Sequence, residues 1–157
     1  MHLKNLTGLF SGLMVILSTP PSVADGNLGL GVMVGDPTGV SVHYWLSKEN
    51  ALHLGMGWDA GDRDIFHLNA DYLFYDFHTI RVDAGNIPFY YGLGLRLVDE
   101  DRPKKDLNLG IRVPVGLHFF FKSSPVDIFL EVAPVVELTP DTDFTIDGSL
   151  GIHYRFR

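Results

Sequence analysis

Apolar and polar residues alternate with a period of two along most of this chain. Near the start, Leu28, Leu30, Val32 and Val34 alternate with Asn27, Gly29, Gly31 and Met33, and seven similar runs follow. Such alternation predicts β-strands, because successive side chains of a strand point to opposite faces of the sheet. We expect eight strands, at residues 27–34, 40–46, 52–58, 66–74, 89–97, 107–119, 127–137 and 147–156.

Turn-forming residues separate the runs, and no segment after residue 24 has a sustained helical period. Glycine, proline, serine, asparagine or aspartate residues gather at 35–38, 47–50, 59–64, 99–106, 122–125 and 139–143. The longest expected connection runs from Tyr75 to Asn86, and residues 79–82 are expected to extend the fifth strand or to form a small extra hairpin. If the runs form an outer-membrane barrel of the usual topology, both termini lie in the periplasm. The loops at 35–38, 59–64, 99–106 and 139–143 are then expected on the outer side of the membrane.

The first 24 residues have the pattern of a secretory signal peptide. Lys4 precedes an apolar core of about a dozen residues, shorter than the roughly 20 that a membrane-spanning helix needs, and Ser22-Val23-Ala24 is a small-x-small cleavage site. An uncleaved N-terminal anchor is the alternative. We therefore expect a signal peptide at 1–24 and one β-barrel domain at 25–157.

The smaller of the two alternating faces is rich in glycine. A soluble barrel or sandwich buries its apolar face, whereas an outer-membrane barrel turns that face to lipid. Glycine weakens a solvated strand, but a narrow eight-stranded interior needs small residues. Aromatic residues near strand ends also suit the girdles of a membrane barrel; they are Trp45, Trp58, Phe74, Phe89, Tyr91, Phe119, Tyr154 and Phe156. The pattern predicts an all-β protein, an eight-stranded antiparallel up-and-down transmembrane β-barrel in the cell outer membrane.

Composition narrows the function classes. The chain of 157 residues has a formal net charge of −7 and no cysteine. An acidic chain without a basic stretch argues against nucleic acid as a partner, and the lack of cysteine removes disulfides and thiolate metal sites.

The C-terminal run has a second meaning. From Ser149 to Phe156 the spacing is polar-x-Gly-x-x-aromatic-x-aromatic, with Gly151, Tyr154 and Phe156 at the marked positions. This pattern resembles the terminal-strand signal that the outer-membrane assembly machinery reads on bacterial β-barrels. The barrel assembly machinery is therefore an expected partner, although Arg157 follows the aromatic residue that usually ends such chains.

Several blocks resemble a family of small bacterial outer-membrane barrels, related in shape to OmpA and OmpX and in several cases of unknown function. The likeness covers nearly all of residues 27–156 and implies an eight-stranded barrel in contact with outer-membrane lipid and lipopolysaccharide, but no chemistry. We expect a monomer. The blocks are Gly-Asp-Pro-Thr-Gly at 35–39, Tyr44-Trp45-Leu46, Ala70-Asp71-Tyr72-Leu73, Pro88 to Gly92, Gly110 to Gly116 and Asp127 to Pro134.

Six charged residues fall on the inward face of the predicted strands. A buried charge is costly unless it is paired, so they are expected to form a structural network that fills the lumen, with Arg112–Glu131 as the best single pair. The alternative is a gate or a narrow ion path, whereas a wide pore does not fit eight strands. The six are Asp71, Arg96, Arg112, Glu131, Glu137 and Asp147.

Inward-facing histidines raise the question of a metal site. No tight ligand spacing connects them, and they are expected to lie at different heights, so we predict lumen hydrogen bonding, no metal and no cofactor. Likewise, the aspartates of the outer loops are expected to form a solvated acidic surface rather than a calcium site. The histidines are His43, His53, His67, His118 and His153.

An enzyme remains the alternative from another class, since some small outer-membrane barrels modify lipids. Ser41 and His43 share the inward face, and Asp71 could reach them, but this placement is away from lipid. We therefore predict a protein without catalysis, with a structural or surface-interaction role. A lipid-modifying enzyme and a narrow ion channel are the alternatives.

Overall fold

The computed structural model describes residues 27–60, 64–100 and 107–156, all as strands and turns. The predicted signal peptide at 1–24, Arg157 and parts of two outer loops lie outside the described residues. The strands are β1 (Leu28–Gly35), β2 (Gly39–Trp45), β3 (Asn50–Ala60), β4 (Asp64–Val82), β5 (Gly85–Glu100), β6 (Leu107–Arg112), β7 (Val115–Phe121), β8 (Val126–Thr139) and β9 (Asp143–Phe156).

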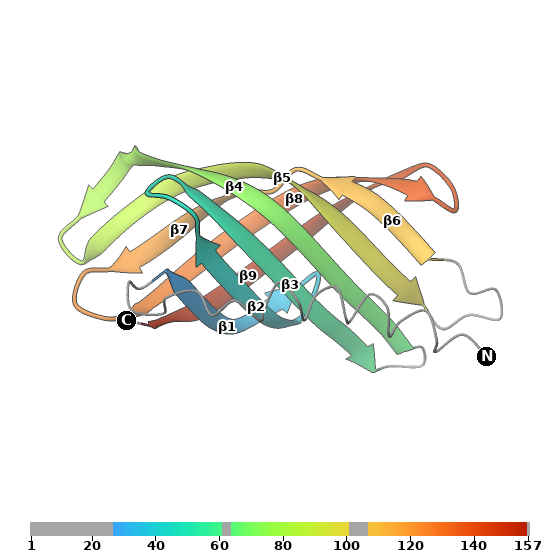
Figure 1. The fold of residues 1–157 in the computed structure, drawn as a ribbon, viewed down its shortest axis with the longest axis horizontal. Helices are drawn as coiled ribbons and strands as arrows, with labels where there is room; N and C mark the ends of the chain where they lie inside the picture. Colours follow the sequence, from blue (N-terminus) through green and yellow to red (C-terminus); the bar gives the residue numbers. More distant parts are fainter. Residues whose placement is uncertain (1–26, 61–63, 101–106, 157) are drawn as a thin grey trace.

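The strands close into an antiparallel ring (Figure 1). Apart from β6 and β7, which do not pair with each other, each strand pairs with the next along the chain, and β9 pairs with β1. Because β6 and β7 both lie between β5 and β8, they are two parts of one strand, and the nine strands make a ring of eight. This confirms the predicted eight-stranded antiparallel β-barrel.

The break between β6 and β7 occurs at Val113 and Pro114, inside the predicted run 107–119. Proline has no backbone N–H to donate to the ladder, so regular pairing stops there. The neighbouring strands still bind the interrupted segment, since Val113 N–H donates to Pro134 O at 3.0 Å and Gly92 N–H donates to Pro114 O at 2.9 Å.

The segment from Tyr75 to Asn86 differs from the prediction. It is not a long connection, because β4 continues to Val82 and only Asp83 and Ala84 separate it from β5. Residues 80–82 extend the fourth strand and pair with 85–87 of the fifth. The register shifts between Asp76 and Ile80, and this irregularity breaks the period of two that would have marked the strand in the sequence.

The barrel has two distinct ends. The β4–β5 and β7–β8 hairpins lie at one of them, and the β8–β9 hairpin lies at the other (Figure 1). We call the first the turn end, with turns at 46–49, 83–84 and 122–125, and the second the loop end, with turns at 36–38 and 140–142. At the loop end Gly35 has a φ of 128°, a conformation that favours glycine, and its N–H donates to Thr38 Oγ1 at 3.0 Å.

The two faces of the sheet have opposite polarity. Large apolar side chains such as Leu93, Leu95, Leu130 and Ile146 are exposed around the outside, while charged and polar side chains are buried inside the ring. Within the described part of the chain, no helix is long and apolar enough to cross a membrane.

Outward aromatic residues lie toward both ends of the barrel, as expected of girdles. Trp58 and Phe144 are 62% and 60% exposed toward the loop end, and Phe74, Tyr91 and Tyr154 are exposed toward the turn end. Trp45 was wrongly placed among them. Its ring packs inside the barrel against Tyr75, with 4.6 Å between the ring centroids, because position 45 shares the inward parity of β2.

Candidate functional site

The interior side chains form pairs that reach across an intervening strand. In four such pairs, the ladder residue between the two partners is a glycine, which has no side chain to fill the gap. A Cβ on Gly94 would collide with Asp71 Oδ1, and a Cβ on Gly116 would lie 2.6 Å from the Tyr90 ring. The four are Ser41–Gly31–His153, Asp71–Gly94–Arg112, Tyr90–Gly116–Glu131 and Arg96–Gly110–Glu137.

Arg96 organises the interior toward the loop end. Its Nη1 donates to Glu137 Oε1 at 2.6 Å, and its Nε lies 3.0 Å from Asp147 Oδ2. These three side chains are 5–17% exposed, so they are largely removed from solvent. One cation thus faces two carboxylates on β8 and β9.

Arg112 occupies the middle of the lumen. Its Nη2 donates to Glu131 Oε1, and its Nε lies 3.3 Å from Asp71 Oδ1, with all three side chains no more than 2% exposed. Tyr90 Oη donates to Glu131 Oε2 at 2.8 Å, and Asn69 Nδ2 donates to Asp71 Oδ2 at 3.0 Å. The guanidinium is therefore held between two carboxylates that are themselves hydrogen-bonded. Such pairing offsets the free-energy cost of burying these charges.

The structure brings together all six charged residues that the sequence placed inside, as two groups around Arg96 and Arg112. It also adds interior polar groups that were not included in that set. Tyr90 and Asp127 have the same parity as Arg96 and Glu131 within the runs 89–97 and 127–137, so alternation puts them on the inward face without indicating their partners. Tyr75 lies in the segment that was expected to be a connection, so the period of two did not reveal its inward position.

Four histidines, His43, His53, His118 and His153, lie close together between Arg112 and the turn end. The ring of His43 lies 6.1, 5.2 and 5.6 Å from the rings of His53, His118 and His153, measured between centroids. The expectation that the histidines lie at different heights was therefore wrong for these four. Strand tilt and register, which parity does not reveal, bring them to one level. His67 lies apart from them, nearer the loop end, opposite Gly57 and Val98.

Ser41 is paired with two of these histidines, though not with the expected His43. Its Oγ lies 2.7 Å from both His53 Nε2 and His153 Nε2. His153 Nδ1 lies 2.9 Å from Asp127 Oδ1, so the side chains of Ser41, His153 and Asp127 form a continuous chain of contacts. Ser41 is only 1% exposed and its hydroxyl is shared between two rings, which leaves no approach for a substrate carbonyl.

Asp127 is the acid at the centre of the cluster. Its Oδ1 lies 2.6 Å from His118 Nε2 and 2.9 Å from His153 Nδ1, and its Oδ2 lies 3.4 Å from Arg155 Nε. The other nitrogen of His118 lies 2.9 Å from Tyr75 Oη. Among the described residues, two sets of side chains have ligand atoms close enough to hold a metal ion: His118, Asp127 and His153, and His53, Asp71 and Glu131.

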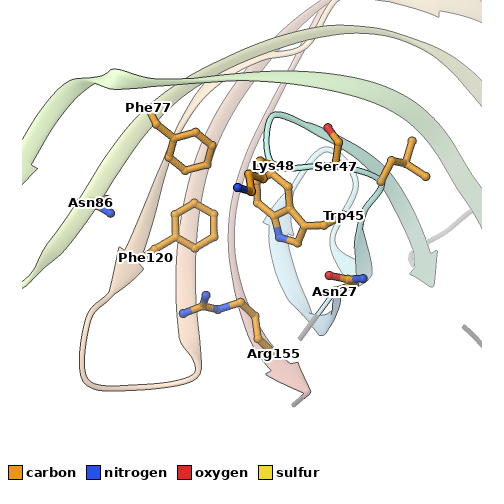
Figure 2. A pocket seen from close by; sticks show the side chains of 9 residues that line it. Asn27, Trp45, Ser47, Lys48, Phe77, Asn86, Phe120 and Arg155 are labelled. Atoms are coloured by element: carbon orange, nitrogen blue, oxygen red, sulfur yellow. The ribbon is translucent and has the colours of Figure 1, made fainter. Parts of the chain in front are cut away.

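A cavity of about 510 Å³ opens at the turn end, directly beyond the histidines. Figure 2 shows the rings of Trp45, Phe77 and Phe120 around it, with Lys48 and Arg155 at its sides. Phe120 stacks on His118, with 4.2 Å between centroids, and the guanidinium carbon of Arg155 lies 5.2 Å from the Phe120 ring. The cavity thus combines flat apolar walls with two cations, which suits an anion that carries an apolar group.

The residues of the C-terminal signal lie on both faces of β9. Gly151 faces inward, against the Phe129 ring, while Tyr154 and Phe156 are exposed on the outside, with 5.2 Å between their ring centroids. Recognition of this strand by the assembly machinery stays a prediction.

No protein-family model matches this chain, and the comparison with curated proteins gives no match. Among solved structures, the chain is similar to the N-terminal β-barrel domain of OprF from Pseudomonas aeruginosa. The TM-score is 0.55 with 14% sequence identity, over 82% of this chain and 94% of that domain. This chain has an OprF-like, OmpA-like barrel fold. At this identity the likeness describes shape alone and carries no ligand or activity across.

Proposed function

We propose that this chain is a non-catalytic integral outer-membrane β-barrel with a closed lumen and a structural or surface-interaction role. The carrying observation is the inverted polarity: exposed apolar side chains surround the ring, while Arg112, Asp71 and Glu131 are buried within it. A water-soluble barrel would have the reverse arrangement. The fold similarity to a barrel domain of OprF supports the outer membrane as the location.

In this proposal the turn end faces the periplasm and the loop end faces outward. Short periplasmic turns are usual in such barrels, and the turns at 46–49 and 83–84 fit that end. The outer partners are lipid and lipopolysaccharide, the barrel assembly machinery inserts the chain as a monomer, and nucleic acid is not a partner.

The lumen favours a closed barrel over an ion channel. Arg112 and Arg96 lie at successive levels of the interior, and each contacts two carboxylates from other strands. An ion that passed through would have to displace these contacts in a narrow space. Catalysis is disfavoured by the burial of Ser41, the nucleophile that the alternative enzyme would use.

The test is to fold the chain, without residues 1–24, into lipid vesicles and to compare boiled and unboiled samples on a gel. We expect a mobility shift on boiling, co-flotation with vesicles and no conductance in planar bilayers. A chain that stays soluble without detergent contradicts the membrane proposal. Steady single-channel currents contradict the closed lumen, and release of fatty acid from lipopolysaccharide contradicts the absence of catalysis.

A second candidate function is the binding of a small organic anion at the turn-end cavity. The specific observation is the combination of three aromatic rings with Lys48 and Arg155 in an otherwise acidic chain. A second, larger hollow of about 900 Å³ shares Phe120 and Arg155 and adds Arg81, Lys122 and the acidic Asp83, so positive charge predominates along this end.

Naphthoate and the neutral naphthalenemethanol make a matched pair of probes for this cavity. In a Trp58→Phe protein, Trp45 is the single remaining tryptophan and reports on the cavity. We expect naphthoate to change the fluorescence of Trp45 at a lower concentration than naphthalenemethanol does. Arg155→Gln should remove this difference between the two probes. Equal responses to both probes would contradict an anion site.

A further inference from the structure

We propose that His118, Asp127 and His153 form a binding site for a divalent transition-metal ion, with Zn(II) as the reference ion, inside the barrel. The three residues come from adjacent strands, β7, β8 and β9. Asp127 Oδ1 lies 2.6 Å from His118 Nε2 and 2.9 Å from His153 Nδ1. Ligand atoms of a tetrahedral zinc site are about 3.3 Å apart. The three ligand atoms here lie within 4.8 Å of one another, so side-chain shifts of about 1 Å each bring them to that spacing.

The second nitrogen of each histidine has the partner that a metal ligand needs. Metal-bound histidines usually donate their other ring N–H to an acceptor that fixes the ring. Tyr75 Oη lies 2.9 Å from His118 Nδ1, and Ser41 Oγ lies 2.7 Å from His153 Nε2. Both hydroxyls are buried, and both come from strands outside the ligand set.

The hydrogen bonds that continue from Ser41 to His53 favour the donor direction that a metal-bound His153 requires. With metal, His153 Nε2–H donates to Ser41, the Ser41 hydroxyl donates to His53 Nε2, and His53 Nδ1 carries the proton. That N–H then faces Asp71 Oδ2 at 3.6 Å. Without metal the chain runs the other way, because His153 donates to Asp127, and a neutral His53 then turns a lone pair toward the Asp71 carboxylate.

The Tyr75 branch behaves in the same way. When His118 Nδ1–H donates to Tyr75, the tyrosine hydroxyl is free to donate to His43 Nε2, 3.5 Å away. Reversal of both branches changes the histidine tautomers but leaves the number of bound protons the same. Metal binding is therefore not opposed by a net loss of protons from these groups.

The donor set selects the class of ion. Two imidazoles and one carboxylate suit zinc or cobalt, whereas calcium and magnesium prefer oxygen ligands. Three protein ligands leave one tetrahedral position for water or a further ligand, and the His43 ring centroid lies 5.2 Å from that of His118. The turn-end cavity is the nearest route by which an ion could enter from solvent. Phe120 lines this cavity and stacks directly on His118, so movement of one ring connects the cavity to the site.

The test uses the tag-free chain without residues 1–24, refolded in detergent under metal-free conditions. Zn(II) is titrated by calorimetry, and Co(II) is followed by visible absorption, where a tetrahedral site gives intense bands. We expect one ion per chain. His118→Gln and His153→Gln should lower Zn(II) affinity at least tenfold, and His67→Gln and His78→Gln, which alter histidines outside the cluster, should leave it unchanged.

Ser41→Ala keeps all three ligands and removes one orienting hydroxyl, so we expect a loss of affinity of about 10-fold to 100-fold. A gel of boiled and unboiled samples checks that each variant is folded, independently of metal. If a ligand variant does not fold, the wild-type Co(II) spectrum and the effect of Ser41→Ala decide. No tetrahedral Co(II) bands in the folded wild type would overturn the proposal, as would Zn(II) binding abolished by His53→Gln but kept in His118→Gln.

Discussion

The Arg112 guanidinium contacts Asp71 across strand β5, at the point where Gly94 leaves the space between them empty. Arg112 Nε lies 3.3 Å from Asp71 Oδ1, and Gly94 is the ladder partner of both residues. The same arrangement recurs with Gly116 between Tyr90 and Glu131. Glycine on the inner face therefore allows interior side chains to pair across one strand.

The first prediction concerns this space. Gly94→Ala puts a methyl group where Asp71 Oδ1 now lies, so the carboxylate must move away from Arg112. We expect a loss of about 1–3 kcal/mol in the free energy of unfolding, the usual range for overpacking. Gly148→Ala is the control, because its Cβ meets no atom closer than 3.9 Å. Urea unfolding in vesicles measures both, and equal stabilities would refute the role of Gly94.

The second prediction concerns the charge of Arg112. Arg112→Ala leaves Asp71 and Glu131 buried without their cation, and we expect the free energy of unfolding to fall by about 3–5 kcal/mol. Arg81→Ala, on the exposed β4–β5 hairpin, should change the free energy of unfolding by less than about 0.5 kcal/mol. Urea midpoints give the comparison. If Arg112→Ala proves as stable as Arg81→Ala, the pairing contributes nothing to folding.

The third prediction tests the outer apolar surface that is proposed to face lipid. Leu95 is 57% exposed near the middle of the outer face, between the aromatic residues of the two ends. Leu95→Lys should lower the free energy of unfolding in bilayers by about 2–4 kcal/mol, because the ammonium would lie at the bilayer midplane. Val82→Lys, at the tip of the β4–β5 hairpin, is the matched control and should cost about 0–1 kcal/mol. The opposite order would mean that lipid covers another part of the surface.

The fourth prediction separates the two tryptophans. Trp58 is exposed on the outer face, whereas Trp45 packs inside against Tyr75. In vesicles of brominated lipid, we expect strong quenching of Trp58 in the Trp45→Phe protein and weak quenching of Trp45 in the Trp58→Phe protein. Strong quenching of both would place Trp45 in lipid and contradict its interior position.

Much of the architecture could be predicted from the sequence. The period of two assigned strands and faces, because side-chain direction depends only on position within a strand. Turn residues such as Gly35 marked where strands end. Prediction failed from Asp76 to Ile80, where a change of register interrupts the period, and for Trp45, where an aromatic residue near a strand end was taken for a girdle residue despite its inward parity.

For the interior side chains, the direction in which each one points and the partner that it meets have different origins. Within the regular runs, alternation alone assigned the side chains that face the lumen, because a period of two needs no knowledge of the neighbouring strands. Which of these side chains meet depends on the register and closure of the folded barrel. A strand that slips by two residues keeps the same face but exchanges every partner. Closure of β9 onto β1 brings Ser41 to His153, 112 residues away, and gathers four histidines at one level, a contact set that register and ring closure fix together.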